Sequence, residues 1–562
     1  METKLHSIWC ELFGEDNISY SSSYDSIGVD SLVRLKLLSL YRKHFGIRNM
    51  KAAELFQYTT IEEHARLIKQ KQTPPNGEIK DDIKSLQELT YQTNGSKQNS
   101  VNFAPTSYVQ NSIWLNEQQL HSLAIWNLPL ILKIRKEKVS ISRLHSAILA
   151  VITKHKILRT SYKRSETCIL QVVKQAPSLD EVQRENYYSF QTSVIANLKN
   201  ELLEDILQNE SIGNVLDLER GIVLRCHLIK DFHNDSNNSS DHEDLLYPND
   251  LIFFNFHHIA FDRMSLKPFL SDLQLAYSTT ELHILDATID FQYIDHAIDE
   301  RKMIEDPSPE SEMNRARIHW QKIFEGYNYE KTLRLPYDFN IDSRSGRGDH
   351  LDFEIDEYIT TALSDFARQS NITMFELLIT CFYLFLSKLT DDNDVCMGSI
   401  AANRHTAEVQ NLIGMFVNFV PYRLRFDPTL SFKDLTWQVH QTCSEVSQYS
   451  YLPSQEIIPA GLRLQIYFRY YSTANSLKVI NLNEAICDVF DDNFNINYVA
   501  RHDLQLFIKH EQQSHDKQHK GKLMCTFGYA IEVFNRSTIA VLSEDFQTLL
   551  KQLIHHKSNL SQ

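Results

Sequence analysis

A pair of adjacent histidines, with an acid four residues further on, is the stretch of this chain best suited to chemistry. His257 and His258 follow the apolar run 251–256, and Asp262 comes four residues after the second histidine. Because imidazole changes its charge near neutral pH, a histidine held in one orientation can accept and return a proton. With 23 histidines in 562 residues, roughly one such pair is expected by chance. The dipeptide alone therefore does not identify a catalytic site.

Two comparisons within the sequence narrow the chemistry of this stretch. The other histidine pair, His555-His556, lies in a polar C-terminal helix without a nearby acid, and we interpret it as solvated surface. A metal site formed by His258 and Asp262 is not indicated, because no third ligand stands at a useful spacing. The sequence thus favours acid–base chemistry at His258 and predicts no metal site.

Ser31, at the start of an expected helix, is the second candidate for chemistry. It follows Gly28-Val29-Asp30 and precedes apolar residues that recur at helical spacing up to Phe45. Serine is a common N-cap, because its hydroxyl accepts a hydrogen bond from a backbone N–H of the first turn. The free N–H groups and the positive end of the helix dipole equally suit a phosphodiester. Ser31 is therefore either a helix cap or a site of modification.

The apolar pattern divides the chain into a short helical region and a longer region of mixed structure. Residues 1–72 show helical spacing, and residues 73–100 are rich in Pro, Gly, Asn and Ser, as in an exposed linker. From residue 101 onward strands alternate with helices, which is typical of α/β folds. The expected strands are 221–230, 251–256 and 395–400, and the expected helices are 141–157, 357–369 and 374–389.

Length and composition exclude several classes of protein. A chain of 562 residues should contain more than one domain. Its net charge of −15 argues against nucleic-acid binding, because nothing would offset phosphate repulsion. The eight cysteines form no C-x-x-C pair, and the N-terminus has no apolar signal core. We therefore expect a cytoplasmic, multidomain protein without a membrane span.

Residues 25–32 resemble the attachment motif of carrier domains in nonribosomal peptide synthetases. The resemblance rests on Asp25-Ser26-Ile27-Gly28-Val29-Asp30-Ser31-Leu32 and on the order of the expected helices. It implies an all-α, four-helix carrier domain over residues 1–72, with 4′-phosphopantetheine attached to Ser31. The linker 73–100 would keep this domain at high local concentration near the rest of the chain.

The remainder of the chain is similar to the condensation domains of the same synthetases. The matching stretches occur in the family's order: Ser107-x-x-Gln110-x-x-x-Trp114, His155-x-x-Leu158-Arg159-Thr160, His257-His258-x-x-x-Asp262, Tyr293-x-Asp295-x-Ala297, Leu335-Pro336-x-Asp338, Gly398-Ser399-x-x-Ala402-x-Arg404, and Ile413-Gly414-x-Phe416-Val417-Asn418 with Arg423. The resemblance implies a two-lobed α/β domain like chloramphenicol acetyltransferase, with its N-lobe at 101–285, its C-lobe at 286–562 and the histidines in a tunnel between them.

The resemblance also implies roles for individual residues. His258, ahead of His257, would orient the nucleophile and take its proton as an amine attacks a carrier-bound thioester. Asp262 would pair with an arginine, for which Arg423 is our choice, and shape the loop that holds the histidine. Ser265 fits the D-x-x-S form of terminal, cyclising members. Arg159 and Asn418 would support the site, and Asn418 lines the tunnel or makes a structural hydrogen bond.

Three departures from the family pattern leave alternatives open. Arg263 replaces the usual glycine after the aspartate, Lys156 replaces a glutamate, and Ser112 stands where arginine is common. The alternatives are a terminal domain that releases or cyclises product, a catalytically silent carrier-docking module, and a free-standing acyltransferase that uses coenzyme A thioesters. We recognise no adenylation or thioesterase segment, so activated monomers come from other chains, or this sequence is a fragment or terminal piece. The expected partners are other synthetase modules, their loaded carriers and a phosphopantetheinyl transferase.

Overall fold

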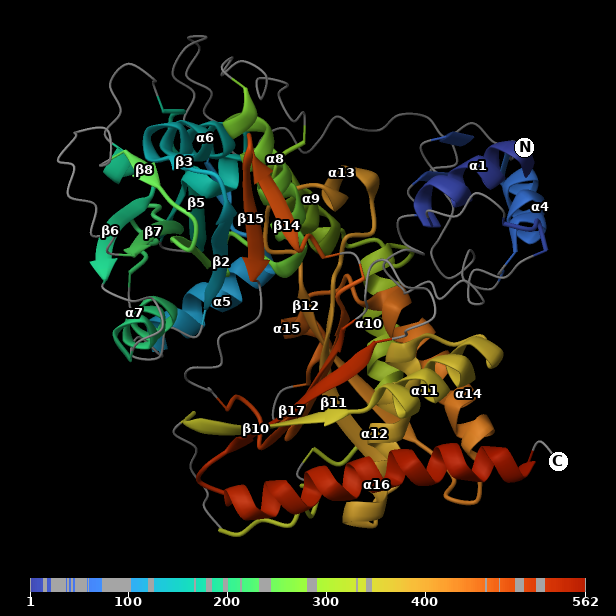
Figure 1. The fold of residues 1–562 in the computed structure, drawn as a ribbon. Helices are drawn as coiled ribbons and strands as arrows, with labels where there is room; N and C mark the ends of the chain where they lie inside the picture. The colour runs from blue at the N-terminus through green and yellow to red at the C-terminus, as the bar shows by residue number, and fades with distance from the viewer. Residues whose placement is uncertain are drawn as a thin grey trace.

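The computed structural model describes a helical unit at the N-terminus and a large α/β body after it (Figure 1). The described residues are 2–13, 18–21, 37, 40, 41, 44, 45, 58 and 60–72, and then 103–560 except for 120–125, 166–167, 178–183, 196–200, 213–214, 232–243, 280–290, 330–331, 340–345, 460–461, 475, 491–499 and 512–520.

The N-terminal unit packs around a buried tryptophan. Trp9, on α1 (Glu2–Phe13), donates from Nε1 to the Tyr41 hydroxyl at 2.6 Å. The same hydroxyl lies 3.0 Å from Nδ1 of His64 on α4 (Ile61–Gln72). These elements confirm the helical character expected of residues 1–72, although much of the second expected helix lies outside the described residues.

A six-stranded sheet carries the histidine motif. Its strands lie in the order β14-β15-β2-β9-β7-β6, and β6 with β7 is its parallel pair. The strands are β2 (Asn127–Lys136), β6 (Ser189–Ile195), β7 (Leu224–Asp231), β9 (Leu251–His257), β14 (Val479–Leu482) and β15 (Ala485–Phe490). The expected strand 251–256 is confirmed as β9, which occupies a central position and ends at His257.

Strand β9 is buried on both faces because helices cover both sides of its sheet. Successive side chains of a strand point to opposite faces. Phe254 joins the core formed with α6 (Ile141–Lys154) and α8 (Leu266–Ser278), whereas Phe253 packs on the other face with residues of α7 (Glu201–Ile212). A strand held from both sides gives the residues at its end a fixed position. His257 is the last residue of this strand, and the turn with His258 follows it.

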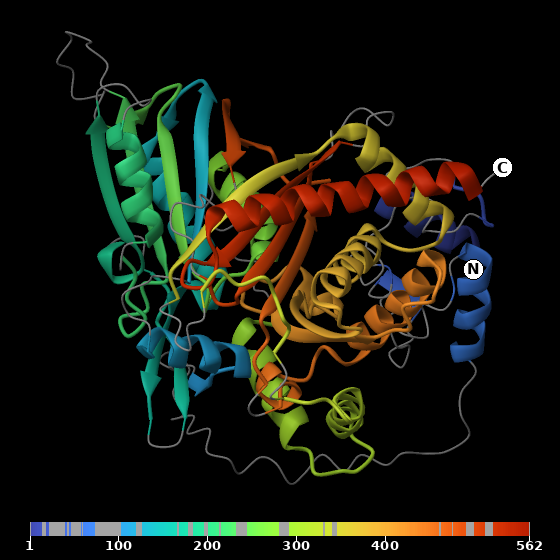
Figure 2. The ribbon, with the colours of Figure 1, turned by 90° about the horizontal axis from the view of Figure 1, so that it is seen from below.

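The second sheet also has six strands, in the order β10-β17-β16-β13-β11-β12. These strands are β10 (Gly348–Ile355), β11 (Asp394–Ala401), β12 (Asn418–Arg425), β13 (Ile466–Ser472), β16 (Leu504–Glu511) and β17 (Lys522–Ala530). The helices that pack with them are α11 (Glu357–Gln369), α12 (Met374–Thr390), α14 (Phe432–Tyr449) and α16 (Arg536–Leu560). The long α16 runs across α11, α12 and β10 (Figures 1 and 2).

Several boundaries expected from the sequence agree closely with this lobe. The helix expected at 357–369 is α11. The helix expected at 374–389 is α12, one residue longer at its C-terminal end, and the strand expected at 395–400 is β11, one residue longer at each end. Among the helices that the structure describes, no single one is long and apolar enough to cross a membrane. Only α11 and α12 taken together pass that test, and they are bent by 110° at their junction.

Segments from the second half of the sequence form part of the N-terminal lobe, which the predicted division at residue 285 did not include. Strands β14 and β15 come late in the sequence, yet β15 pairs with β2 and so extends the N-terminal sheet. Ile413 and Phe416 also belong to the hydrophobic core of the N-terminal lobe. The apolar faces of these segments are buried by the first lobe, so the lobes share a core that consecutive sequence ranges cannot describe.

The remaining elements include two smaller sheets, with the strand orders β1-β5-β4 and β3-β8. They are β1 (Phe103–Pro105), β3 (Val139–Ser140), β4 (Thr160–Arg164), β5 (Ile169–Val173), β8 (Leu245–Leu246), α5 (Tyr108–Gln119), α9 (Tyr293–Glu305), α10 (Glu312–Ile323), α13 (Ala407–Gln410), α15 (Ser454–Ile457) and the 3-10 turns at Lys156–Arg159, Arg184–Asn186 and Arg263–Ser265.

Candidate active site

His258 stands in the turn that follows β9. Its backbone N–H donates to the carbonyl of Trp126 at 2.8 Å, and the Trp126 ring meets the imidazole edge-on, with ring centres 5.9 Å apart. Nδ1 of His258 is buried without a hydrogen-bond partner, whereas the residue as a whole keeps part of its surface accessible. This leaves Nε2 as the candidate ring nitrogen for contact with a substrate.

The surroundings of His258 keep its imidazole neutral. Desolvation by the surrounding protein lowers the pKa of His258 to about 4, and the positive charges of Arg501 and Arg469 act in the same direction. The Asp262 carboxylate opposes this shift without reversing it. Because a neutral imidazole is the form that accepts a proton, His258 is ready to act as a base at neutral pH.

His257 has a structural role in this arrangement. Its side chain is 3% exposed, and its Nδ1 accepts a hydrogen bond from the backbone N–H of Ile259 at 3.1 Å. Its Nε2 lies 3.8 Å from a carboxylate oxygen of Glu117. One ring nitrogen of His257 is thus engaged by the backbone, and the order with His258 ahead of His257 as the proton acceptor stays a prediction.

Asp262 pairs with Arg404 and not with Arg423, which corrects the partner chosen from the sequence. Nη2 of Arg404 donates to Oδ1 of Asp262 at 2.7 Å, and the two side chains are 1% and 0% exposed. Arg423, on β12, is bonded instead to both carboxylate oxygens of Asp394 at 2.6 and 2.8 Å. Asp394 begins the neighbouring strand β11 and is much closer to Arg423 than the histidine loop is.

Ser265 completes the set of hydrogen bonds around Asp262. Its hydroxyl and its backbone N–H both donate to Oδ1 of Asp262 at 2.9 Å, and the hydroxyl accepts from the backbone N–H of Gly414 at 3.0 Å. The second oxygen of Asp262 accepts from the N–H of Phe416 at 3.2 Å. A single buried carboxylate therefore ties the histidine loop to Arg404 and to the segment 414–416, which comes late in the sequence and packs in the core of the N-terminal lobe.

Residues of the opening and fourth motifs reach the same region. The Gln110 amide donates to the carbonyl of Ile259 at 3.1 Å, next to the histidine. Ser107 and Tyr293 share a hydrogen bond of 2.9 Å, and the Tyr293 hydroxyl donates to the carbonyl of Met415 at 2.5 Å. Stretches that lie far apart in the sequence thus meet around the turn that contains His258.

Gly414 is required by this close packing. A Cβ built on Gly414 would lie 2.1 Å from Cδ2 of Tyr293, inside the ring's van der Waals surface. The glycine therefore permits the contact between the stretches that begin at Tyr293 and at Ile413, and both Tyr293 and Trp114 are buried packing residues.

The remaining site residues expected from the sequence are structural. Asn418 donates to the carbonyls of Ser450 and Leu452 at 2.7 and 2.6 Å, which favours the structural hydrogen bond over a lining role. Arg159 donates to the backbone carbonyl of Lys174. Neither side chain makes a contact with the His258 loop among the described residues.

Some functional neighbours of His258 were not recognised from the sequence. Arg404 lay in a stretch noted as family-like, but nothing local showed that it would reach Asp262. Arg469, Arg501 and Trp126 carried no motif signal at all. Ser31 and the motif around it lie outside the described residues.

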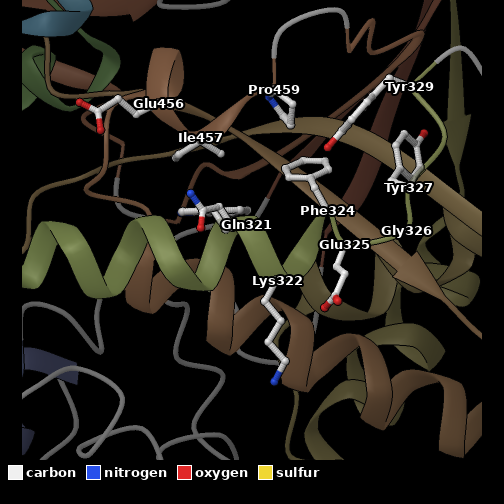
Figure 3. Close-up of a pocket in the computed structure, with 11 residues that line it drawn as sticks. Gln321, Lys322, Phe324, Glu325, Gly326, Tyr327, Tyr329, Glu456, Ile457 and Pro459 are labelled. Carbon is white, nitrogen blue, oxygen red and sulfur yellow. The ribbon is translucent and has the colours of Figure 1, made fainter. Parts of the chain in front are cut away.

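A separate cavity of about 660 Å³ lies on the C-terminal lobe, beside α10 and α15 (Figure 3). Aromatic side chains line it, with charged groups at its edge: Phe324, Tyr327, Tyr329, Lys322, Glu325 and Glu456 are among its lining residues. No residue of the His257-His258 motif lines it, so this cavity is not the candidate active site.

Comparisons with known proteins agree with this geometry. Residues 3–68 match the model of the phosphopantetheine attachment site, and residues 100–561 match that of the condensation domain. A linear gramicidin synthase protein of Brevibacillus parabrevis is 24% identical over 97% of this chain and 10% of that synthase protein. Bacitracin synthase 3 of Bacillus licheniformis is 23% identical over 98% of the chain and 8% of that synthase. The chain thus spans at most a tenth of these relatives.

Solved structures share the fold. The X-domain from teicoplanin biosynthesis superposes with a TM-score of 0.65 at 18% identity, covering 80% of this chain and 95% of that one. The first condensation domain of the calcium-dependent antibiotic synthetase, in complex with a substrate analogue, gives 0.60 at 16% identity, covering 81% and 97%. The condensation match includes most of the chain and the entire constellation around His258, and this chain therefore belongs to the condensation-domain family, with a phosphopantetheine attachment domain preceding the condensation domain.

Proposed function

We propose that this chain forms amide bonds in nonribosomal peptide synthesis, with His258 as the residue that handles the proton. The single observation that carries the proposal is a neutral imidazole on a partly accessible residue, held by a buried aspartate loop at the point where the family's motifs meet. In the reaction, the amine nitrogen attacks the thioester carbonyl carbon, the C–N bond forms and the C–S bond breaks. Nε2 of His258 takes the amine proton and returns it to the departing sulfur.

Positioning should contribute more to this reaction than base strength. An α-amino group has a pKa of about 7.7–8, so roughly a tenth to a sixth of it is neutral at pH 7. That shortfall costs only about 1–1.4 kcal/mol, whereas holding two reactants in attacking geometry contributes about 7–11 kcal/mol. The rigid loop of His258 serves this purpose, because it fixes the imidazole relative to both lobes.

The pH dependence of the rate should follow the acceptor amine and not a histidine. The pKa of His258 is about 4, so its imidazole stays neutral at neutral pH and is lost as a base only when the pH falls through about 4. Between about pH 6 and 8 the rate should rise as the amine loses its proton. Single-turnover rates with two acceptors of different amine pKa test this. An inflection near 6.5 that is the same for both acceptors would contradict it.

We also propose Ser31 as the attachment point of the cofactor, residues 1–72 as the carrier domain and 73–100 as the linker. Ranges 101–285 and 286–562 then form most of the two lobes, except that β14 and β15 of the later range join the sheet of the first lobe. When bound, 4′-phosphopantetheine presents an acyl group as a thioester. The family match over residues 3–68 supports the cofactor, and the position of Ser31 at an expected helix N-terminus supports the residue. Because coenzyme A is the source of the arm, we place the reaction in the cytoplasm, where a phosphopantetheinyl transferase and other synthetase modules supply loaded carriers.

Ser31→Ala should abolish loading. The protein is incubated with a phosphopantetheinyl transferase and coenzyme A, and its intact mass is measured before and after. We expect the wild type to gain one phosphopantetheine group and the variant to gain none. Ser26→Ala, in the same stretch, is the matched control and should load normally. A mass gain that persists in Ser31→Ala would remove Ser31 as the attachment point.

A second candidate is a docking module that binds carriers without turnover, and Arg263 is the observation that favours it. This residue replaces the usual glycine beside Asp262, and its guanidinium lies 4.4 Å from the centre of the Tyr471 ring. Carrier binding without product from any loaded pair would support this candidate. A third candidate is a terminal domain that releases or cyclises product, which the D-x-x-S form with Ser265 favours. Such a domain would give product without a second carrier.

A further inference from the structure

The imidazole of His258 is not oriented by a hydrogen bond to another of the described residues. The turn itself is well held, because its N–H bonds the carbonyl of Trp126 and the buried Asp262 anchors the loop. These bonds fix the backbone, whereas the ring can still turn about its Cβ–Cγ bond, a torsion with broad minima in histidine. Nδ1 of the ring is buried without a hydrogen-bond partner. The orientation of the imidazole therefore depends on what packs against it.

The indole of Trp126 is the ring that meets this imidazole. Trp126 comes directly before β2, and the next pair along the ladder is Asn127 with His257. Trp126 therefore stands opposite His258, and the side chains of opposite residues lie on one face of a strand pair. The two ring centres are 5.9 Å apart and the ring planes meet at 80°, an edge-to-face contact that aromatic rings favour. Rotation of the imidazole would break this contact, so the indole restrains it.

The indole in turn is in contact with a cation of the C-terminal lobe. The guanidinium of Arg501 lies 4.0 Å from the centre of the Trp126 ring, within the range of cation–π contacts. Nε1 of Trp126 is buried without a hydrogen-bond partner, so no hydrogen bond from that atom orients the indole. Ring contacts thus connect the guanidinium, the indole and the imidazole in series.

The sheet of the C-terminal lobe places Arg501. The next residue, His502, donates from Nδ1 to the carbonyl of Leu464 at 2.8 Å. The ring of His502 also stacks on that of Tyr467 in β13, with ring centres 5.3 Å apart, and β16 begins two residues later. Because Trp126 precedes a strand of the N-terminal sheet, its contact with Arg501 crosses from one lobe to the other.

A second contact of the same kind holds the far end of the turn. The guanidinium of Arg263, in the 3-10 turn after Asp262, lies 4.4 Å from the centre of the Tyr471 ring in β13. Here the N-terminal lobe supplies the cation and the C-terminal lobe supplies the ring, the reverse of the first contact. The stretch 258–263 is therefore tied to the C-terminal lobe at one end through Trp126 and at the other end directly.

We propose that Trp126 is a positioning residue, which keeps the imidazole of His258 aligned with the reacting amine, and that Arg501 acts through Trp126. This inference rests on the proposed function and adds two residues to it. The alignment depends on contact between the lobes, because the guanidinium comes from one lobe and the imidazole from the other. A displacement of about 1 Å at a reacting group can cost about 100-fold in rate. A loosened indole therefore slows the reaction without removing the base.

The test is single-turnover amide formation by the whole chain, with loaded donor and acceptor carriers at several acceptor concentrations. We expect Trp126→Leu to lower the maximal rate by about tenfold or more, while the acceptor concentration that gives half of that rate changes by less than about twofold. Trp126→Phe keeps an aromatic ring and should recover most of the rate. Trp437→Leu is the matched control and should keep the full rate, because Trp437 also stacks on a histidine, His440, but on α14.

Arg501→Met leaves the indole in place and should lower the maximal rate by about threefold to tenfold, so it tests the inference even where Trp126→Leu does not fold. Two combinations then show whether the residues act in series. In the Trp126→Leu protein, Arg501→Met should change the rate by less than about twofold, because the contact is already lost. In the His258→Ala protein, Trp126→Leu should likewise change the small remaining rate by less than about twofold.

Losses that multiply in either combination would overturn the inference, since Trp126 or Arg501 would then act somewhere other than on the imidazole. An unchanged rate in Trp126→Leu or in Arg501→Met, or a change confined to the half-saturating concentration, would overturn it as well. The proposed function is measured separately, by product from wild type and His258→Ala. Product that depends on His258 but not on Trp126 would leave the proposed function standing and remove only the positioning role. Equal product from wild type and His258→Ala would overturn the proposed role of His258 itself.

Discussion

His258→Ala should lower the rate of amide bond formation by about 100-fold or more, with little change in the binding of carriers. General acid–base catalysis by a positioned side chain contributes typically about 10²–10⁴-fold, and the neutral imidazole of His258 is the group placed to supply it. The effect should fall on the chemical step, since the backbone N–H of residue 258 still bonds the Trp126 carbonyl in the variant.

Single-turnover experiments with loaded donor and acceptor carriers, analysed by intact mass, measure this effect directly. His350→Ala, on strand β10, is the matched control, because His350 is half-buried in the other lobe and contacts no residue of the His258 loop among the described residues. Equal product from wild type and His258→Ala would remove His258 from the mechanism. A similar loss in the control would indicate a general effect on the lobe and not on catalysis.

Asp262→Ala and Arg404→Met should each destabilise the condensation domain by about 3–5 kcal/mol, because each leaves one fully buried charge without its partner. The loss should extend to activity, since the aspartate also accepts hydrogen bonds from Ser265 and from the backbone of Phe416. Without these bonds the loop that ends β9 loses its fixed position relative to the other lobe.

The shift of the unfolding transition, followed by thermal or denaturant melting of the whole chain, measures the stability, and single-turnover rates on the folded protein measure the activity. Arg423→Met is the informative comparison. It breaks the pair with Asp394 and should destabilise β11 and β12, but it should leave the rate per folded molecule unchanged. A selective loss of rate in Arg423→Met, with Arg404→Met unaffected, would restore the partner first chosen from the sequence.

The chain's own sequence determined the elements and the family. A short continuous apolar run predicted β9, an amphipathic repeat predicted α11, and a longer apolar stretch predicted α12, each to within a residue or two at its ends. Such a pattern is a property of neighbours along the chain, and it survives whatever packs against them. The motifs around His258 and Asp262 were recognisable for the same reason, since each is a short stretch with fixed spacing.

The tertiary structure alone decided which distant groups meet. Arg404 and Asp262 are separated by 142 residues, and Arg423 was an equally plausible arginine by type. The late strands β14 and β15 joined the first sheet because their apolar faces are buried there, and Arg501 came to lie 4.0 Å from the centre of the Trp126 ring, which meets His258. An ion pair depends on a distance of a few ångströms in space, and sequence spacing carries no information about that distance once the chain has turned back on itself.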